Sequence, residues 1–312
     1  MPDICLVTGG AGFIGSHIVK RLVKDGKQVR VVDNFCTGSI ERLGSVRPKV
    51  EFVEADLAEP AVCERVVDGV DYVLHQAAIP SVQRSIRDPI ASNRANMTAT
   101  LNLLESCRKQ GVKRVVYAAS SSAYGNTEVL PKREEMATIP LSPYALQKLV
   151  GERYCRLYHD LYGLETVSLR YFNVFGPLQD PNSEYSAVIP KFITRLLAGE
   201  RLTVYGDGEQ SRDFTYIDNV VDANLLALTA ADGVGRVFNI GCGERISLNQ
   251  LIQKLGSIMG VSPAVDYLAP RAGDVRDSLA AIDLAGRYLG YVPSVSVEEG
   301  LRRTVAAFKT HR

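Results

Sequence analysis

The chain is 312 residues long, and its 36 basic and 35 acidic side chains leave a formal charge of +1. This balance argues against a nucleic-acid-binding or lipid-surface-binding protein, which needs a surplus of basic residues. Hydrophobic residues make up 46% and charged residues 23% of the chain, as in ordinary globular proteins. Because no apolar run is long enough to cross a bilayer and no basic leader precedes the first apolar run, we expect a cytoplasmic protein without a membrane segment.

Cysteine and histidine usage gives no indication of a metal site. The six cysteines form no CxxC or CxxH pair, and the four histidines form no HExxH motif. We therefore expect no bound metal, and we expect the thiols to be small buried side chains in a reducing compartment.

In the first half of the chain, short apolar runs alternate with longer segments of helical period. The runs predict strands over Ile4–Thr8, Val29–Asp33, Val50–Glu54, Tyr72–Gln76, Val115–Ala119 and Thr166–Arg170. The intervening segments predict helices with an apolar stripe from Ile14 to Val23, from about Ala91 to Gln110, and from Ser142-Pro143 to Tyr162. This alternation is typical of repeated βαβ units and predicts an α/β fold with a doubly wound parallel sheet.

Beyond about Asn173 the character of the chain changes, because Gly, Pro and Asp become frequent. Isolated strands are predicted over Leu202–Tyr205 and Val237–Ile240, and helices over Val188–Ala198, Val220–Ala231, Leu248–Met259 and Val297–Lys309. We expect residues 1–172 to form the parallel-sheet domain. Residues 173–312 should form mainly a smaller α/β lobe, with some chain returning to the first domain.

A glycine-rich turn follows the first predicted strand, with Gly9, Gly12 and Gly15 spaced three residues apart. Glycines at such a turn let the backbone approach a diphosphate and leave helix N-terminal N–H groups facing it. The next strand ends in Asp33, about 20 residues beyond the loop, where a carboxylate binds ribose hydroxyls. The glycine loop and Asp33 together indicate a dinucleotide, and the carboxylate favours NAD over NADP. The structural alternatives are an ordinary βα turn for the glycine loop and a turn residue at the end of a strand for Asp33.

Hydroxyl groups cluster where the fifth predicted strand ends, at Ser120 to Ser122. A helix opens shortly afterwards with Tyr144 and Lys148, which lie four residues apart and therefore on one face. A fixed ammonium and a positive nicotinamide ring both favour the phenolate, so we expect Lys148 and bound NAD together to lower the pKa of Tyr144 toward the range of a general base. A lone YxxxK is more often an exposed helix face, and its significance here comes from its order after the glycine loop and the serine.

The segments TGGAGFIGSH, LSPYALQK, LRYFNVFGP and SRDFTYIDN resemble the extended short-chain dehydrogenase/reductases, specifically the UDP-hexose 4-epimerases. Gln179-Asp180-Pro181 through Ala187-Val188-Ile189-Pro190-Lys191 resembles the members that act on N-acetylhexosamines. The resemblance covers nearly the whole chain. It implies a Rossmann-type domain, an NAD cofactor and inversion at C4 of a UDP-hexose through a transient 4-keto sugar.

The resemblance also assigns roles to residues. Tyr144 would be the base for the C4 hydroxyl, Lys148 the ribose-binding and pKa-lowering residue, and Ser120 the hydroxyl on the substrate oxygen, with Ser122 assisting. The implied cofactor contacts, besides these catalytic groups, are Gly9, Gly12, Phe13, Ile14, Gly15, Asp33, Asn34, Phe35, Thr37, Gly38, Asp56, Leu57, Gln76, Ala77, Ala78, Asn96 and Phe172.

The implied nucleotide-sugar contacts lie mostly in the second half of the chain. Two arginines would bind the diphosphate, other residues would form the uracil wall, and Ser278 would occupy the position that limits pocket size. The implied set is Ser81, Ser122, Asn173, Ala187, Val188, Lys191, Thr203, Tyr205, Arg212, Arg271 and Ser278. Serine at 278 leaves room for an N-acetyl group, so we expect UDP-N-acetylglucosamine and UDP-N-acetylgalactosamine, with UDP-glucose and UDP-galactose as further substrates. Pro80 departs from the galactose epimerases, which often have lysine there.

Other activities fit the residues less well. A 4,6-dehydratase would need Asp-Glu where this chain has Ser121 and Ser122, and a decarboxylase would need Glu at 122. A UDP-glucuronate 4-epimerase remains the nearest rival, and an NAD-binding regulatory protein is the non-enzymatic alternative. The family resemblance further implies a homodimer joined as a four-helix bundle through Ala91–Gln110 and Tyr144–Leu161, although these helices could also pack only on the sheet.

Overall fold

The computed structural model describes residues 3–181, 187–269 and 276–310. Seven strands form one sheet in the order β11-β6-β5-β4-β1-β2-β3, and every neighbouring pair is parallel. These strands are β1 (Ile4–Thr8), β2 (Gln28–Asp33), β3 (Glu51–Glu54), β4 (Tyr72–His75), β5 (Arg114–Ser120), β6 (Glu165–Tyr171) and β11 (Arg236–Ile240). The order reverses beside β1, which is the Rossmann arrangement, and it brings the carboxyl ends of β1, β4 and β5 together.

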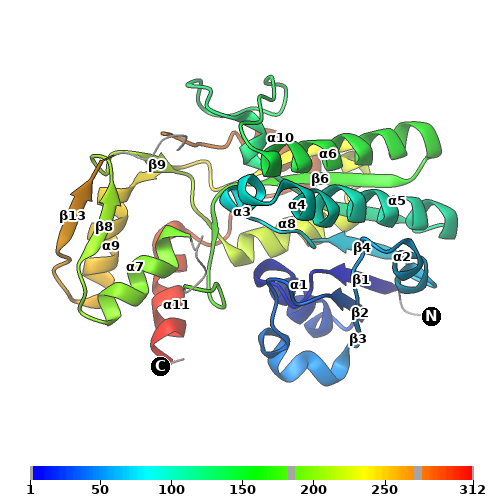
Figure 1. Cartoon of the computed structure of the whole chain (residues 1–312), viewed down its shortest axis with the longest axis horizontal. Coiled ribbons are helices and arrows are strands. Elements are labelled where there is room, and N and C mark those ends of the chain that lie inside the picture. Colours follow the sequence, from blue (N-terminus) through cyan, green and yellow to red (C-terminus); the bar gives the residue numbers. More distant parts are fainter. Residues whose placement is uncertain (1–2, 182–186, 270–275, 311–312) are drawn as a thin grey trace.

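Helices cover both faces of this sheet (Figure 1). Consecutive strand residues alternate between two apolar clusters, so that Val7 and Val116 belong to one cluster and Leu6 and Val115 to the other. The first face is covered by α1 (Phe13–Lys24) and α8 (Ile217–Thr229). The second face is covered by α2 (Pro60–Val67), α5 (Ala99–Gln110) and α6 (Pro143–Tyr162). Burial on both faces explains why the strands read as nearly continuous apolar runs.

Part of the second half of the chain forms the smaller group of elements on the left of Figure 1, which we call the C-terminal lobe. Its main strand pair is β8 with β13, which run parallel. The lobe contains α7 (Val188–Leu197), β8 (Leu202–Tyr205), β9 (Ser211–Arg212), β12 (Ile246–Ser247), α9 (Leu248–Met259), β13 (Val265–Leu268) and α11 (Val297–Thr310). Between the lobe and the sheet lie the paired β7 (Val174–Phe175) and β10 (Thr215–Tyr216), and α10 (Asp283–Leu289) packs near β11.

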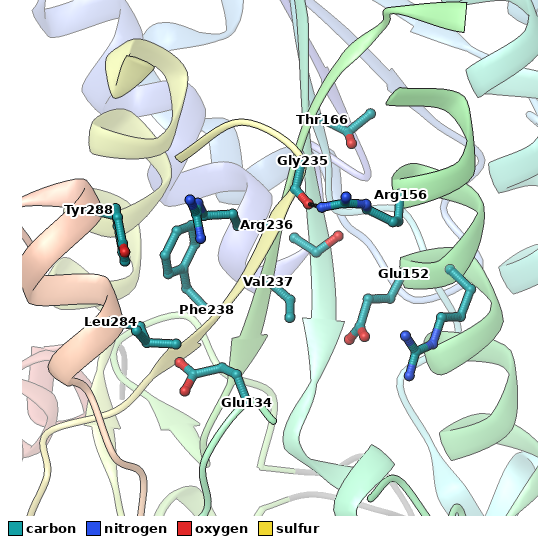
Figure 2. A pocket seen from close by; sticks show the side chains of 12 residues that line it. Glu134, Glu152, Arg156, Thr166, Gly235, Arg236, Val237, Phe238, Leu284 and Tyr288 are labelled. Atoms are coloured by element: carbon teal, nitrogen blue, oxygen red, sulfur yellow. Dashed lines mark hydrogen bonds between the residues drawn. The ribbon is translucent and has the colours of Figure 1, made fainter. Parts of the chain in front are cut away.

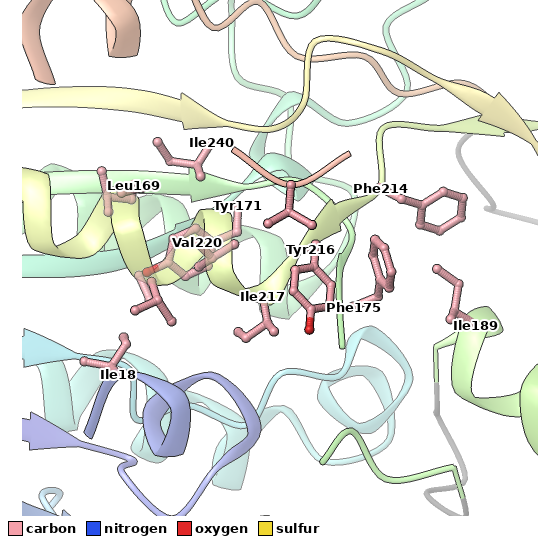
Figure 3. Packing of buried hydrophobic residues seen from close by; sticks show 14 of the residues in the cluster. Ile18, Leu169, Tyr171, Phe175, Ile189, Phe214, Tyr216, Ile217, Val220 and Ile240 are labelled. Atoms are coloured by element: carbon pink, nitrogen blue, oxygen red, sulfur yellow. The ribbon is translucent and has the colours of Figure 1, made fainter. Parts of the chain in front are cut away.

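One apolar cluster runs without interruption from the sheet into the C-terminal lobe (Figure 3). It contains Ile18 of α1 and Val220 of α8 at the sheet, and Phe214 and Ile189 in the lobe, with aromatic rings between them. Phe175 packs edge-on against Phe214 and Tyr216, with ring centroids 6.3 and 5.7 Å apart. The lobe is therefore fixed to the sheet by shared core packing and not by a linker.

The structure corrects two expectations about individual elements. Val237–Ile240 was expected as an isolated strand, but it is part of β11, which extends the main sheet beyond β6. The expected single helix over Ala91–Gln110 is interrupted, because α4 (Pro89–Asn93) passes into a π-helical turn (Arg94–Thr98) before α5. The π-helical turn lies inside a segment that is helical throughout, so the spacing of apolar residues did not reveal it.

Several short elements between the predicted ones were not foreseen. They are a kinked 3₁₀ segment (Ile40–Lys49), α3 (Val82–Arg87), and 3₁₀ turns at Ser121–Tyr124 and Ala231–Gly233. Each is too short or irregular to show a helical period. Within the described ranges, no helix combines the length and the apolar character that a membrane crossing requires.

Candidate active site

The turn between β1 and α1 has room only for glycine at two of its positions. Gly9 has a φ of +64°, and a Cβ there would lie 2.8 Å from the backbone of Ala77. A Cβ on Gly15 would lie 2.2 Å from the carbonyl oxygen of Gly9. The helix begins at Gly12 without a side-chain cap, so its first N–H groups are left for another partner. This arrangement fits a diphosphate group such as that of NAD.

Asp33 ends β2 beside this turn, as predicted. Its carboxylate accepts hydrogen bonds from the N–H groups of Ala11 at 3.0 Å and Phe35 at 2.8 Å. Burial raises the pKa of Asp33, and these N–H groups oppose the rise. A Cβ on Gly38 would lie 2.9 Å from a carboxylate oxygen. Backbone can therefore approach Asp33 closely only because residue 38 is glycine, and this too fits a ribose-binding carboxylate.

The segments after β2 and β3 lie beside each other. Phe35 has a φ of 56° and stacks on Phe52 of β3, with ring centroids 5.4 Å apart. Asp56 accepts a hydrogen bond from the N–H of Ala58 at 2.9 Å, so one of its oxygens closes a turn. Leu57 is buried. Sequence reasoning missed Phe52, because an aromatic residue within a strand carries no functional signal of its own.

The turn after β4 is tied to the glycine loop and to α8. The N–H of Ala77 donates to Thr8 Oγ1 at 3.1 Å, and Gln76 Nε2 donates to Asn224 Oδ1 at 3.0 Å. His75 lies between Thr8 Oγ1 at 2.7 Å and Thr100 Oγ1 at 2.9 Å, and burial lowers its pKa to about 3. A neutral imidazole therefore holds the ends of β1 and β4 against α5.

The π-helical turn carries Asn96, which is buried and fully engaged with the protein. Its Oδ1 accepts from the N–H of Ile79 at 2.8 Å, and its Nδ2 donates to Gln147 Oε1 at 2.8 Å. Ser92 Oγ also donates to Gln147 Oε1, at 2.8 Å. Gln147 precedes Lys148 on α6, so this network fixes the helix that carries both Tyr144 and Lys148.

Ser120, Tyr144 and Lys148 meet at the carboxyl end of β5. Ser120 is the last residue of β5, and its Oγ lies 2.8 Å from Ser122 Oγ. Ser142 caps α6 by accepting from the N–H of Ala145 at 3.1 Å, which sets Tyr144 in the first turn. Lys148 Nζ donates to the carbonyl oxygen of Ala118 at 2.7 Å. Tyr144 and Lys148 on α6 therefore both face the residues that end β5.

The pKa shifts of Tyr144 and Lys148 are both caused mainly by burial. Burial raises the pKa of Tyr144, and a side-chain hydrogen bond with Ser120 opposes the rise. Burial lowers the pKa of Lys148 to about 8. In the chain without NAD, burial therefore sets the direction of the Tyr144 pKa, and the expected lowering by Lys148 together with a bound nicotinamide stays a prediction.

Asn173, Asp213 and Ser278 form a hydrogen-bonded group behind β6. Asn173 has a φ of 28°, and its Nδ2 donates to the carbonyl oxygen of Asp213 and to Ser278 Oγ, both at 3.0 Å. The Asp213 N–H donates to the Ser278 carbonyl oxygen at 2.9 Å. Asn173 and Ser278, two predicted residues 105 positions apart, thus touch directly. Both also bond to Asp213, which the sequence did not single out.

The other predicted substrate residues are more widely distributed. Arg212 lies on β9 and donates to the carbonyl oxygens of Ser211 and Arg276, at 2.9 and 2.7 Å. Ser81 caps α3 by accepting from the N–H of Arg84 at 3.1 Å, and the ring of Phe172 is buried against Tyr124. The remaining ones lie at the start of α7 or on β8, namely Ala187, Val188, Lys191, Thr203 and Tyr205. Arg271 lies outside the described residues.

A cavity of about 340 Å³ lies elsewhere, over β6 and β11 and between α6 and α10 (Figure 2). None of the predicted site residues lines it. Among its charged side chains, Glu152 is paired with Arg170 at 2.7 Å and Arg156 with Asp160 at 2.7 Å. Because these charges already have partners within the protein, the chemistry is better located at the ends of β1, β4 and β5.

Known proteins resemble the chain over most or all of its length. Residues 5–241 match the model of the NAD dependent epimerase/dehydratase family. A putative UDP-glucose 4-epimerase of Methanocaldococcus jannaschii is 40% identical over 308 residues, covering 98% of each chain.

Two solved structures superpose closely on the whole chain. The UDP-N-acetylglucosamine 4-epimerase of Methanobrevibacter ruminantium M1, in complex with UDP-N-acetylmuramic acid, has a TM-score of 0.95 at 40% identity and covers 100% of both chains. The UDP-glucose 4-epimerase of Thermotoga maritima, with UDP-glucose, has a TM-score of 0.94 at 41% identity and covers 99% of both chains.

Proposed function

The chain belongs to the NAD dependent epimerase/dehydratase family, and from this premise we propose that it interconverts UDP-N-acetylglucosamine and UDP-N-acetylgalactosamine. It is an NAD-dependent UDP-hexose 4-epimerase. UDP-glucose and UDP-galactose are the second proposed substrate pair. The observation that carries the reaction type is the meeting of Ser120, Tyr144 and Lys148 at the end of β5, beside the glycine loop.

We propose that Tyr144 takes the proton of the substrate C4 hydroxyl and later returns it, while Ser120 holds the same oxygen by a hydrogen bond. NAD, when bound, supplies the hydride acceptor and a positive charge beside the phenol. Lys148 would orient the nicotinamide ribose. Burial raises the pKa of Tyr144, so the phenol is a poor base in the unliganded chain.

The proposed NAD site follows the glycine loop, Asp33 and the turn after β4. The uncapped start of α1 would face the diphosphate, and Asp33 would accept bonds from the adenosine ribose through oxygens that already meet two backbone N–H groups. An anionic side chain at this position disfavours a 2′-phosphate.

The substrate proposal depends on Ser278. Its side chain is small and 9% exposed, and its Oγ accepts a hydrogen bond from Asn173. A serine here leaves room beside Asn173 that a bulky residue would fill. Arg212 and Arg271 are the proposed diphosphate ligands, since guanidinium groups bind such dianions well.

We also propose that the enzyme is a homodimer joined through α5 and α6. Large apolar side chains remain exposed along α6, namely Leu146 at 49%, Leu157 at 49% and Leu161 at 67%. Met97 and Leu101 are half-buried on the neighbouring turns. A second copy would cover them, and light scattering at micromolar concentration would reveal the doubled mass. A cytoplasmic location is also proposed, which the six free thiols favour.

The test of this function is proton NMR of the purified protein with UDP-N-acetylglucosamine, UDP-glucose or UDP-glucuronate in separate samples. Interconversion of the N-acetylhexosamine pair is the expected result. Conversion of UDP-glucose alone would overturn the substrate proposal, conversion of UDP-glucuronate alone would support the rival epimerase, and inertness toward all three would overturn the function.

Two variants and one control variant make the experiment more specific. Tyr144→Phe should lose roughly 10²- to 10⁴-fold in turnover, because it removes the proton acceptor, and should retain its NAD. Tyr154→Phe, a half-buried tyrosine on the same helix, is the matched control and should keep parental turnover. Ser278→Tyr should lose UDP-N-acetylglucosamine turnover more than UDP-glucose turnover, and an equal loss of both would contradict the pocket-size argument.

A further inference from the structure

Asp213 presents a carboxylate that is completely buried in the C-terminal half of the chain. The carboxylate accepts three backbone hydrogen bonds, from Cys242 N–H at 2.8 Å and from Gly243 and Ala280 N–H at 3.1 Å each. Cys242 and Gly243 follow β11, whereas Ala280 lies in the segment after residue 276. One side chain thus joins two segments that are far apart in sequence.

The peptide group of Asp213 adds a third connection. Its N–H donates to the Ser278 carbonyl oxygen, and its carbonyl oxygen accepts from Asn173 Nδ2. Asn173 in turn donates to Ser278 Oγ and adopts an unfavourable positive φ of 28°. Arg212 is the preceding residue. Arg212, Asn173 and Ser278, the described residues proposed to contact the UDP diphosphate or to limit pocket size, therefore lie next to Asp213 or bond directly to it.

The carboxylate lies in surroundings that disfavour its charge. Burial raises the pKa of Asp213 to about 6, although three N–H groups oppose the rise. The other titratable groups that face it are Glu244, the Cys242 thiol and Tyr291, whose hydroxyl donates to the Gly241 carbonyl oxygen. Among the described residues, no cation is recorded as a partner of this carboxylate. The three backbone N–H groups are therefore the contacts that favour its charged form.

We propose that Asp213 is a positioning residue for UDP-sugar binding. Its carboxylate joins the segment after β11 to the segment at Ala280, and its peptide group bonds to Asn173 and Ser278, so that these two residues and Arg212 lie in one rigid frame. This inference rests on the proposed function, because it takes those three residues as the substrate contacts. Two oxygens with several lone pairs can serve three N–H donors at once, whereas an amide offers a single acceptor oxygen. Asp213→Asn should therefore loosen the frame while changing little in volume.

The test compares Asp213→Asn with the parent in NAD content, in UDP affinity by calorimetry, and in KM and kcat for UDP-N-acetylglucosamine. A displaced frame should weaken UDP binding and raise KM roughly 10-fold or more, with kcat changed far less and the NAD content unchanged. Asp71→Asn is the matched control, because Asp71 also accepts a backbone N–H, from Ile4 at 2.8 Å, but lies at the amino-terminal ends of β1 and β4. It should leave both UDP affinity and KM unchanged.

A second measurement uses the parent enzyme and so does not depend on how the variant folds. UDP-N-acetylglucosamine carries no phosphate group that titrates near pH 6, so its KM reports on the protein. Because protonation removes acceptor capacity from Asp213, the parental KM should rise as pH falls through about 6. That rise should be absent in Asp213→Asn.

The outcomes separate this inference from the function itself. A parent that binds UDP and turns over UDP-hexoses, with an Asp213→Asn variant of equal KM and UDP affinity, overturns the positioning role. A variant that loses NAD together with UDP affinity and melts far below the parent also overturns it, because the residue would then support the fold generally. A parent that neither binds UDP nor turns over a UDP-hexose overturns the proposed function instead.

Discussion

At the scale of single residues, burial of Lys148 changes the pKa of a proposed catalytic group and also the stability of the fold. Its side chain is 4% exposed, donates to the Ala118 carbonyl oxygen and lies above the ring of Tyr117, with Nζ 5.1 Å from the ring centroid. Water is excluded from the ammonium, so its charged form is destabilised relative to the unfolded chain. The same exclusion keeps the phenol of Tyr144 neutral, and both side chains are therefore tuned by their surroundings more than by each other.

The lowered pKa of Lys148, about 8 against 10.5 in the unfolded chain, predicts a specific pH dependence of stability. Between these values the unfolded state binds more protons, so the stability contributed by this residue rises with pH and is lost as pH falls through 8. The difference amounts to about 3 kcal/mol, or 1.4 kcal/mol per pKa unit. Lys148→Met should therefore be more stable than the parent at pH 7, by an amount that shrinks toward pH 10.5.

Urea unfolding of both proteins at pH 7 and pH 10 measures this difference. Lys109→Met is the control, because Lys109 is exposed and its ion pair with Glu105 lies on the surface. A stability difference between Lys148→Met and the parent that stays constant with pH would contradict the burial argument.

At the scale of elements, the glycines of the β1–α1 segment allow two stretches of backbone to approach closely. Several other glycines of the chain have space around them for a side chain. The contact between Gly15 and Gly9 leaves no space for a side chain, but Gly286 in α10 has its nearest neighbour, the Tyr291 carbonyl oxygen, 3.6 Å from an ideal Cβ. Gly15 therefore cannot accept a side chain whereas Gly286 can, although both lie in helices and the neighbouring sequence does not distinguish them.

Gly15→Ala should therefore displace the loop and abolish retention of NAD, because a Cβ 2.2 Å from a carbonyl oxygen forces the backbone apart. Gly286→Ala is the matched control and should be neutral or stabilise the chain by about 1 kcal/mol, since alanine favours the helix. Absorbance of bound NAD and the melting temperature measure both effects. Full NAD occupancy in Gly15→Ala would show that the loop can rearrange.

For the whole molecule, the shared core makes the sheet and the C-terminal lobe one cooperative structure. Val31 of β2 and Ile189 of α7 are both completely or almost completely buried, and both belong to the cluster that crosses between the two parts. Loss of packing in either part therefore exposes apolar surface in the other.

Thermal unfolding should accordingly show a single transition. Val31→Ala and Ile189→Ala each remove buried methyl groups, and each should destabilise the molecule by roughly 1 to 5 kcal/mol while lowering the same transition. Scanning calorimetry of the parent and both variants measures this. Two resolved transitions, with each variant lowering a different one, would show that the lobe folds independently.

The sequence by itself determined the parallel α/β fold, because apolar runs and helical periods are local properties. The expected strand Ile4–Thr8 and helix Leu248–Met259 agree with the structure at both ends, and the other predicted strands lie within two residues of their observed bounds. The glycine loop, Asp33 and the Tyr144–Lys148 spacing were also readable, since each depends on neighbours in the chain.

Only the tertiary structure decided what depends on distant segments and on burial. The position of β11 in the main sheet depends on its pairing with β6, and the role of Gln147 depends on a π-helical turn some 50 residues earlier. The Tyr144 pKa rises in the chain without NAD because the folded chain excludes water from the phenol. Asp213 gains its importance only when residues near 173, 242 and 280 surround it, and no local pattern encodes that meeting.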